Sequence, residues 1–210
     1  MVTEICLRNL ERTRIEFDLN GIEFDPFCTV SDAHSEYLCN KYEIDYIKTQ
    51  NKPIGTKLDV AIDSYPFDWS HYMGLGSDNV LTTEAINKLS ERIKAGVGVA
   101  GFQDIAFVKG DKMKLYHSRV LFGAGRVVSR FLVDATFRLN GEFYGAKDKA
   151  LDGASFRNIK RTGYTAFEYL SGFDVIDIKG GEDNLNGWDA YNCKEQPISE
   201  RFKKYLFEYN

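Results

Sequence analysis

Apolar and polar residues alternate along one stretch of the chain that contains an Asn-Gly pair, and a second stretch contains the same pair. The first stretch covers residues 14–24, with the pair at positions 20–21. The second covers residues 131–144, with the pair at positions 140–141. Both central residues of a type I′ turn have positive φ, which Asn and Gly tolerate best. The pattern therefore predicts two antiparallel β-hairpins.

Apolar residues recur every three or four positions in two other segments, and a hydroxyl residue that can cap a helix precedes each of them. Thr82 precedes the first segment and Ser199 precedes the second. Such spacing places the apolar side chains on one face of a helix. We therefore predict two amphipathic helices, and a third, shorter one over residues 165–170. The expected buried faces consist of Ala85, Ile86, Leu89 and Ile93 in the first helix and Phe202, Tyr205 and Leu206 in the second.

Three of these features recur in the same order about 120 residues apart, which indicates a degenerate internal duplication. They are the Leu-Asn-Gly sequence, a tryptophan (Trp69 and then Trp188) and the capped helix. We expect an α+β fold built from antiparallel hairpins with a few helices. A duplication predicts an acidic lobe over residues 1–115 and a second lobe over residues 116–210. One compact domain is the alternative.

Composition indicates a globular protein with a hydrophobic core, because 43% of the 210 residues are hydrophobic and 28% are charged. No apolar stretch is long enough to cross a membrane. The first residues lack the basic and apolar regions of a secretory signal. We therefore expect a cytoplasmic protein that does not bind membranes.

The net charge of −4 and the pI of about 5.5 argue against a nucleic-acid partner. The charge is also uneven, since residues 1–105 carry a net −7 and residues 106–210 a net +3. Tyrosines are frequent in the acidic half. An acidic, tyrosine-rich half is suited to a basic protein partner, which it would attract over about a Debye length.

Four cysteines occur without a CxxC pair, so buried free thiols are the favoured interpretation. A zinc site formed by Cys6, Cys28, His34 and Cys39 is a weaker alternative, because structural zinc sites usually draw their ligands from close pairs. No motif for a cofactor is present, and none is predicted.

Acidic and aromatic residues also cluster between positions 59 and 72. The candidate site residues are Asp59, Asp63, Asp68, His71 and Tyr72. Such a set can form a protein-binding surface, in which aromatic side chains anchor a partner of opposite charge. It can also form a general-acid pocket. The third interpretation is structural, with aspartates that cap turns around a buried Trp69.

Two segments resemble bacterial immunity proteins, which protect a cell from contact-delivered toxins. One runs from Phe67 through the Asp-Asn-Val-Leu-Thr-Thr-Glu-Ala sequence at 78–85 and is similar to the middle of the double-CxxCG group. The other is the closing segment from Gly172 to Leu206, with its Ile-Ser-Glu-Arg-Phe sequence. The CxxC pairs of that group are missing here.

The resemblance implies a binding protein rather than an enzyme, which would neutralise a toxin by covering a functional surface. A negative net charge would suit a basic toxin domain as the partner. The alternative is a small hydrolase or transferase that uses a carboxylate or a Cys–His pair. A structural component of a larger assembly is a third possibility.

Overall fold

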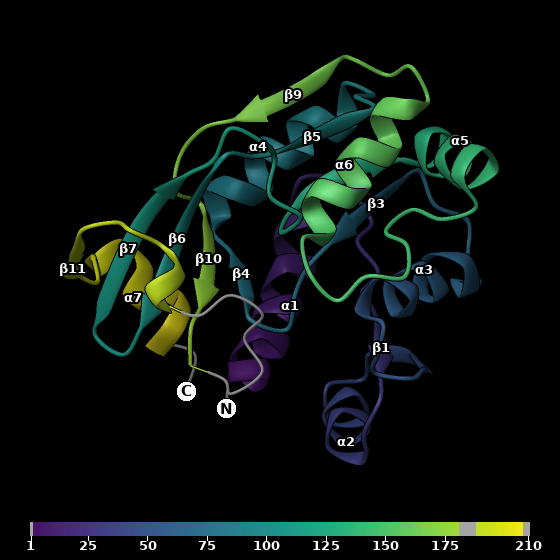
Figure 1. The fold of residues 1–210 in the computed structure, drawn as a ribbon. Coiled ribbons are helices and arrows are strands. Elements are labelled where there is room, and N and C mark those ends of the chain that lie inside the picture. Colours follow the sequence, from purple (N-terminus) through teal and green to yellow (C-terminus); the bar gives the residue numbers. More distant parts are fainter. Residues whose placement is uncertain (1, 181–187, 208–210) are drawn as a thin grey trace.

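The computed structural model describes residues 2–180 and 188–207 (Figure 1). In it, the most continuous buried segment of the chain forms two consecutive strands. These strands are β5 (Val99–Phe102) and β6 (Asp104–Lys109), and only Lys109 among their residues is exposed. Strands that are buried on both faces read as unbroken apolar runs. The two strands belong to different sheets, so this one segment links both.

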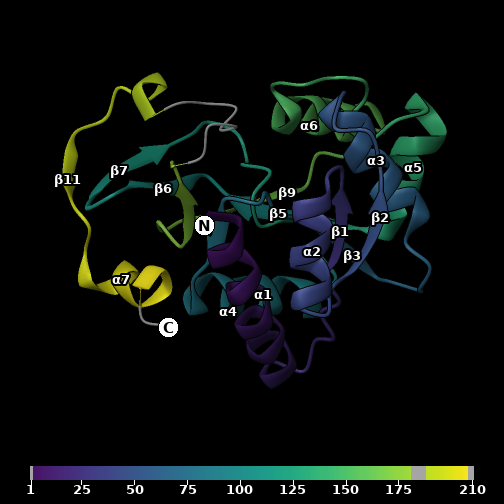
Figure 2. The ribbon, with the colours of Figure 1, turned by 90° about the horizontal axis from the view of Figure 1, so that it is seen from below.

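The described residues form mixed sheets and seven α-helices, which confirms the α+β class. The helices are α1 (Val2–Leu19), α2 (Ala33–Lys41), α3 (Ile54–Ser64), α4 (Thr83–Lys94), α5 (Arg130–Asn140), α6 (Leu151–Arg161) and α7 (Glu200–Phe207). A short 3₁₀ helix, η1, covers Trp188–Ala190. In Figure 2, α7 and β11 lie on the opposite side of the molecule from α3, α5 and α6.

The strands form three sheets. The five-stranded sheet has the order β11 (Glu195–Pro197), β7 (Lys112–His117), β6, β10 (Val175–Ile178), β4 (Asn79–Leu81). The four-stranded sheet has the order β3 (His71–Gly74), β8 (Arg126–Ser129), β5, β9 (Phe167–Leu170). The third sheet is the parallel pair β1 (Phe27–Val30) and β2 (Asp45–Lys48).

The predicted amphipathic helices are confirmed in α4 and α7. The Thr82 hydroxyl accepts a hydrogen bond from the Ala85 backbone N–H at 3.2 Å and so caps α4. Ala85, Ile86 and Leu89 are fully buried in the largest core cluster, and Ile93 packs at its edge. In α7, the buried side chains are those of Phe202, Tyr205 and Leu206, as the pattern predicts.

Both predicted hairpins are wrong, because each Asn-Gly pair ends a helix. Residues 14–19 form the last turns of α1, and the Ile22 N–H donates to the Phe17 carbonyl at 3.0 Å. Gly141 follows α5 with φ +73° and donates to the Phe137 carbonyl at 2.7 Å. A glycine with positive φ is the common helix C-terminal motif as well as a hairpin residue. The local pair alone does not separate the two structures.

The predicted helix over residues 165–170 is also wrong, because this segment contains strand β9. Its residues pair in parallel with β5, in the register Val99 to Phe167. The observed hairpin is β6–β7, which turns at Gly110 with φ +61°. This turn lies shortly before residue 115, where the suggested duplication places the boundary between the two lobes.

Strands from both sides of residue 115 share the two larger sheets, and β7 itself spans that position. The two tryptophans of the suggested repeat differ in structure. Trp69 precedes strand β3, whereas Trp188 begins the 3₁₀ helix η1. Among the described residues, no helix has the length and apolarity that are needed to cross a membrane.

We expect Leu89→Ala to lower the free energy of unfolding by about 2–5 kcal/mol, because Leu89 is 0% exposed in the largest core cluster. The matched control is Leu139→Ala, a helical leucine that is 58% exposed, which should change stability by less than about 0.5 kcal/mol. Urea denaturation of both variants measures the difference. Equal effects would contradict the core described here.

Candidate functional site

Residues 21–68 form a unit beside the two larger sheets that carries much of the acidic excess. This segment contains nine acidic residues and four basic ones. It includes β1, α2, β2 and α3, and in Figure 1 β1 and α2 lie at the lower right, away from β6 and β7. We call this segment the acidic unit.

A helix cap and apolar contacts hold the acidic unit together. The Asp32 carboxylate accepts the Ser35 N–H at 2.8 Å and starts helix α2, which connects the parallel strands β1 and β2. Leu38 and Ile44 are buried against Leu7 of α1. The acidic unit therefore packs against the rest of the protein through helix α1.

A row of three aromatic rings lies on the acidic unit. The ring centroids of Phe27 and Tyr65 are 5.5 Å apart, and those of Tyr65 and Phe67 are 5.6 Å apart. Both pairs have the edge-to-face geometry that aromatic rings prefer. The Phe67 side chain is 56% exposed, which is unusual for a large apolar residue.

Carboxylates surround this aromatic row. The Tyr65 hydroxyl donates to Asp25 Oδ2 at 2.5 Å, and Phe27 is the register partner of Asp45. Burial raises the pKa of Tyr65 well above its usual value, and the negative charges of Asp25, Glu23 and Asp45 raise it further. We define the acidic aromatic face as Glu23, Asp25, Phe27, Asp45, Tyr65 and Phe67.

Among the described residues, the carboxylates of this face have no cationic neighbour, in contrast to Glu4 and Glu36 nearby. Glu4 contacts Lys41 Nζ at 2.7 Å, and this hydrogen bond, with one from Tyr42, lowers the pKa of Glu4 to about 2. Glu36 contacts Lys48 at 2.7 Å. Within the described part of the chain, no Lys or Arg nitrogen lies within 4.0 Å of the carboxylates at positions 23, 25, 43 and 45.

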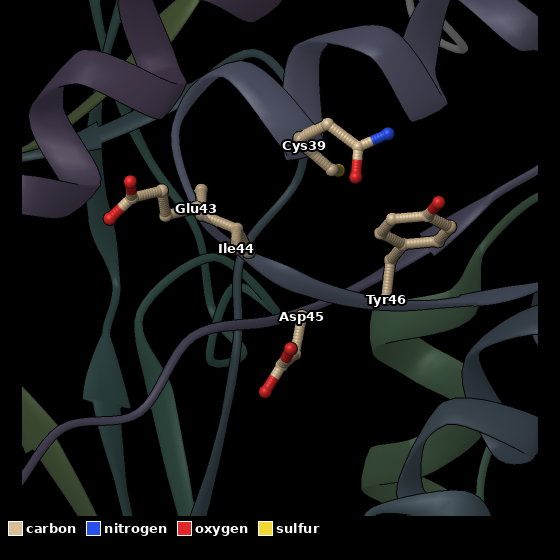
Figure 3. Close-up of a pocket in the computed structure, with 6 residues that line it drawn as sticks. Cys39, Glu43, Ile44, Asp45 and Tyr46 are labelled. Carbon is tan, nitrogen blue, oxygen red and sulfur yellow. The ribbon is translucent and has the colours of Figure 1, made fainter.

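A shallow hollow of about 310 Å³ adjoins the face at the end of α2. Its lining residues are Cys39, Asn40, Glu43, Ile44, Asp45 and Tyr46. Figure 3 shows Cys39 and Tyr46 on one side of the chain, with the Asp45 carboxylate directed to the other side. Asp45 therefore belongs to the acidic aromatic face and also borders the hollow.

The structure divides the five predicted site residues between the interior and the surface. Asp59 in α3 accepts the backbone N–H groups of Tyr144 and Gly145 at 2.8 and 2.9 Å. The Tyr72 hydroxyl lies 3.2 Å from that of Tyr144, and burial raises the pKa of Tyr72. Asp59 and Tyr72 thus converge on the loop around Tyr144 and hold it in place.

The other three predicted residues lie nearer to solvent. Asp63 is exposed at the end of α3, and Asp68 is exposed in an ion pair with Arg130. His71 Nε2 lies 3.0 Å from the Val97 carbonyl oxygen, so this imidazole is used for a backbone contact. Only Asp63 and Asp68 have carboxylates at the surface.

The members of the acidic aromatic face come from three separate segments, which explains why none of them is among the five predicted site residues. Glu23 and Asp25 follow α1, where the sequence predicts a hairpin strand instead. Asp45 begins β2, and Tyr65 and Phe67 follow α3. The signal available in the sequence is the concentration of acidic residues between 21 and 68.

The four residues of the alternative zinc site are not brought together. Within the described residues, no group of three or more His, Cys, Asp or Glu side chains is arranged to hold a metal ion. Cys6 lies in α1 against the five-stranded sheet, whereas Cys28 packs in the small cluster with Leu7. All four cysteines are free thiols.

A histidine–carboxylate pair lies outside the acidic unit. His117 Nδ1 is 2.7 Å from Asp104 Oδ1, and the Gly172 N–H donates to Asp104 Oδ2 at 2.8 Å. Asp104 is buried and the His117 side chain is exposed. A carboxylate that orients an exposed imidazole is the arrangement of a general base. The pair arises from cross-strand register in β6 and β7, which the sequence pattern does not predict.

A second buried polar group lies where β10 ends. Lys179 Nζ is 2.6 Å from Asp177 Oδ1 and 3.9 Å from Asp78 Oδ2. Burial and the negative charge of Asp78 raise the pKa of Asp177 to about 7, although Lys179 opposes this shift. The thiol of Cys6 also lies in the field of both carboxylates.

A scan against models of known protein families found no match, and a search of curated proteins found none either. The function must therefore be argued from the geometry of the chain itself.

We expect the free energy of unfolding to fall as pH rises from about 4 to 7, because of Asp177. The folded protein keeps a proton on this group that the unfolded chain, with a pKa near 3.8, has released. The slope from one group is at most about 1.4 kcal/mol per pH unit. Urea denaturation across this pH range should show a flatter profile in Asp177→Asn, whereas Asp63→Asn, at an exposed position, should keep the wild-type profile.

Proposed function

We propose that this protein binds a basic protein partner, a toxin domain that it neutralises, through the acidic aromatic face. The observation that carries the proposal is a set of carboxylates that have no Lys or Arg within 4.0 Å among the described residues and that surround an aromatic row ending in the exposed Phe67. Nearby, Glu36 of the acidic unit pairs with Lys48, and Glu4 of α1 pairs with Lys41 of the unit. A cation from a partner would supply the missing charge on this face.

Arginine is the side chain that fits such a surface best. Its planar guanidinium stacks on aromatic rings and forms paired hydrogen bonds with carboxylates. Phe67 and Tyr65 offer ring surface beside Asp25 and Asp45. An exposed aromatic residue that a partner buries is a typical binding hot spot. The carboxylates would set the orientation and accelerate association.

The sequence supports the same function in two independent ways. The net charge of −7 over residues 1–105 would attract a basic domain at long range. The segments from Phe67 and from Gly172 resemble bacterial immunity proteins, whose partners are toxins. Both features are consistent with a protein that acts by covering a surface.

A second candidate function is hydrolysis or group transfer with His117 as the general base. The contact of 2.7 Å between His117 Nδ1 and the buried Asp104 favours it. In this case a His117→Gln variant would lose the activity, and variants of the acidic aromatic face would keep it. Chromogenic ester and phosphoester substrates provide the assay.

The test of the binding function is capture of partners from a lysate of the source cells with three immobilised proteins. The wild type should retain a partner with a strongly basic domain, identified by mass spectrometry. The double variant Asp25→Asn/Asp45→Asn should retain at least tenfold less of it, because two carboxylates at the face are neutralised. Salt should weaken the wild-type complex.

The matched control is Glu91→Gln/Asp111→Asn, which changes the net charge equally at exposed positions on α4 and the β6–β7 turn. It should retain the partner as the wild type does. An equal loss of captured partner in both double variants would mean that only the net charge matters, and this would contradict a defined binding face. Capture of the same amount of partner by Asp25→Asn/Asp45→Asn as by the wild type would contradict a defined face as well.

A further inference from the structure

The exposed side of helix α6 carries three basic side chains, those of Arg157, Lys160 and Arg161. Residues three and four positions apart lie on the same face of a helix, so these side chains form one group. Within the described part of the chain, no Asp or Glu oxygen lies within 4.0 Å of their charged nitrogen atoms. We call these three residues the basic face of α6.

The contacts of the basic face leave its positive charge uncompensated. Lys160 Nζ lies 4.7 Å from the centroid of the Phe156 ring, and Arg161 Nη1 donates to Asn158 Oδ1 at 3.2 Å. Neither neighbour carries a negative charge. The opposite side of α6 is buried, through Phe156 and Ile159 among others, so the helix is a firmly packed support for the three cations.

The acidic aromatic face has the complementary chemistry. Its Asp25 and Asp45 are exposed, and no Lys or Arg nitrogen of the described residues lies within 4.0 Å of these carboxylates. The Phe67 ring beside them is also exposed. An arginine guanidinium binds carboxylates and stacks on aromatic rings. Arg157 and Arg161 therefore match this face in charge and in the type of side chain.

Helix α3 links the two faces within one chain. Near its start, the Gly55 N–H donates to the Lys147 carbonyl at 2.8 Å, in the loop that precedes α6. Tyr65 and Phe67 follow its other end, and a helix of 11 residues is about 16 Å long. In both ribbon views, α3 lies between α6 and β1 (Figures 1 and 2). Two copies with antiparallel α3 helices would bring each basic face to the acidic aromatic face of the other copy.

We propose that two copies of this chain form a dimer, in which the basic face of α6 in each copy binds the acidic aromatic face of the other. The inference rests on the face assigned in the proposed function, but it needs no toxin. A second copy and a basic partner would compete for the same face. Such reciprocal pairing gives the closed twofold symmetry that is commonest among homodimers.

A nucleic acid is another polyanion that could bind a basic face, but the structure favours a second copy. The three basic residues span only about 6 Å along the helix axis. The chain as a whole carries a net charge of −4, which would repel an extended phosphate backbone beyond this short face. The acidic aromatic face instead presents its carboxylates as a compact group.

The test measures the mass of the purified protein by analytical ultracentrifugation at low salt over a range of concentrations. We expect a concentration-dependent species with twice the chain mass of 24.0 kDa, which dissociates at high salt. Arg157→Gln/Arg161→Gln should weaken the dimer by about tenfold or more. The matched control is Lys94→Gln/Lys109→Gln, which removes two exposed positive charges elsewhere and should dimerise as the wild type does.

An exchange of charge between copies tests the pairing of the two faces. Asp25→Lys/Asp45→Lys and Arg157→Glu/Arg161→Glu should each be monomeric alone. Their equimolar mixture should form a heterodimer, because both contacts again join opposite charges. Dimerisation of the mixture would also show that both variants are folded, and circular dichroism checks the fold of each one alone.

A wild type that stays monomeric at every concentration would overturn the proposal, and so would assemblies larger than a dimer. Folded exchange variants that stay monomeric when mixed would overturn it too, as would binding of single-stranded DNA by α6 without self-association. Arg157→Gln/Arg161→Gln should still capture the basic partner. Failure of the dimer and failure of the binding function are therefore distinguishable.

Discussion

Two segments that run side by side from one sheet into the other determine the architecture. Residues 99–109 supply β5 and then β6, and residues 167–178 supply β9 and then β10, with parallel pairing in both sheets. Between the sheets the backbone must still satisfy its polar groups. The Gln103 N–H donates to the Leu170 carbonyl at 3.2 Å, and the Asp104 carboxylate accepts the Gly172 N–H. The largest core cluster fills the space around this crossing.

The buried carboxylate beside this crossing and the carboxylates of the acidic aromatic face have different surroundings. Asp174, beside the crossing, is nearly inaccessible and contacts both Lys88 and Arg201. Such pairing compensates for burial of charge. On the acidic aromatic face, Asp25 and Asp45 are exposed, and no Lys or Arg nitrogen of the described residues lies within 4.0 Å of their carboxylates. Uncompensated charges beside the exposed Phe67 ring are more useful for recognition of a partner than for stability of the fold.

Elements that depend on local periodicity can be predicted from the sequence. The prediction is wrong where the same local sequence is compatible with two different structures. Thr82 and the apolar face of α4 are apparent from their spacing. The Asn-Gly pairs are not, because glycine with positive φ serves a hairpin and a helix end equally well. Tertiary pairing with β5 makes a strand of residues 167–170. The acidic aromatic face combines three distant segments, and only the fold brings Asp25 to Tyr65.

The most direct test of the binding role is a titration of isotope-labelled protein with a short polyarginine peptide, followed by two-dimensional NMR. The account predicts saturable shifts of backbone amide signals confined to the non-proline residues of 23–27, 43–46 and 65–67, and these shifts should weaken as salt is added. A polyglutamate peptide should leave the spectrum unchanged. Saturable shifts centred on another surface, or no shifts at the acidic aromatic face, would contradict the account.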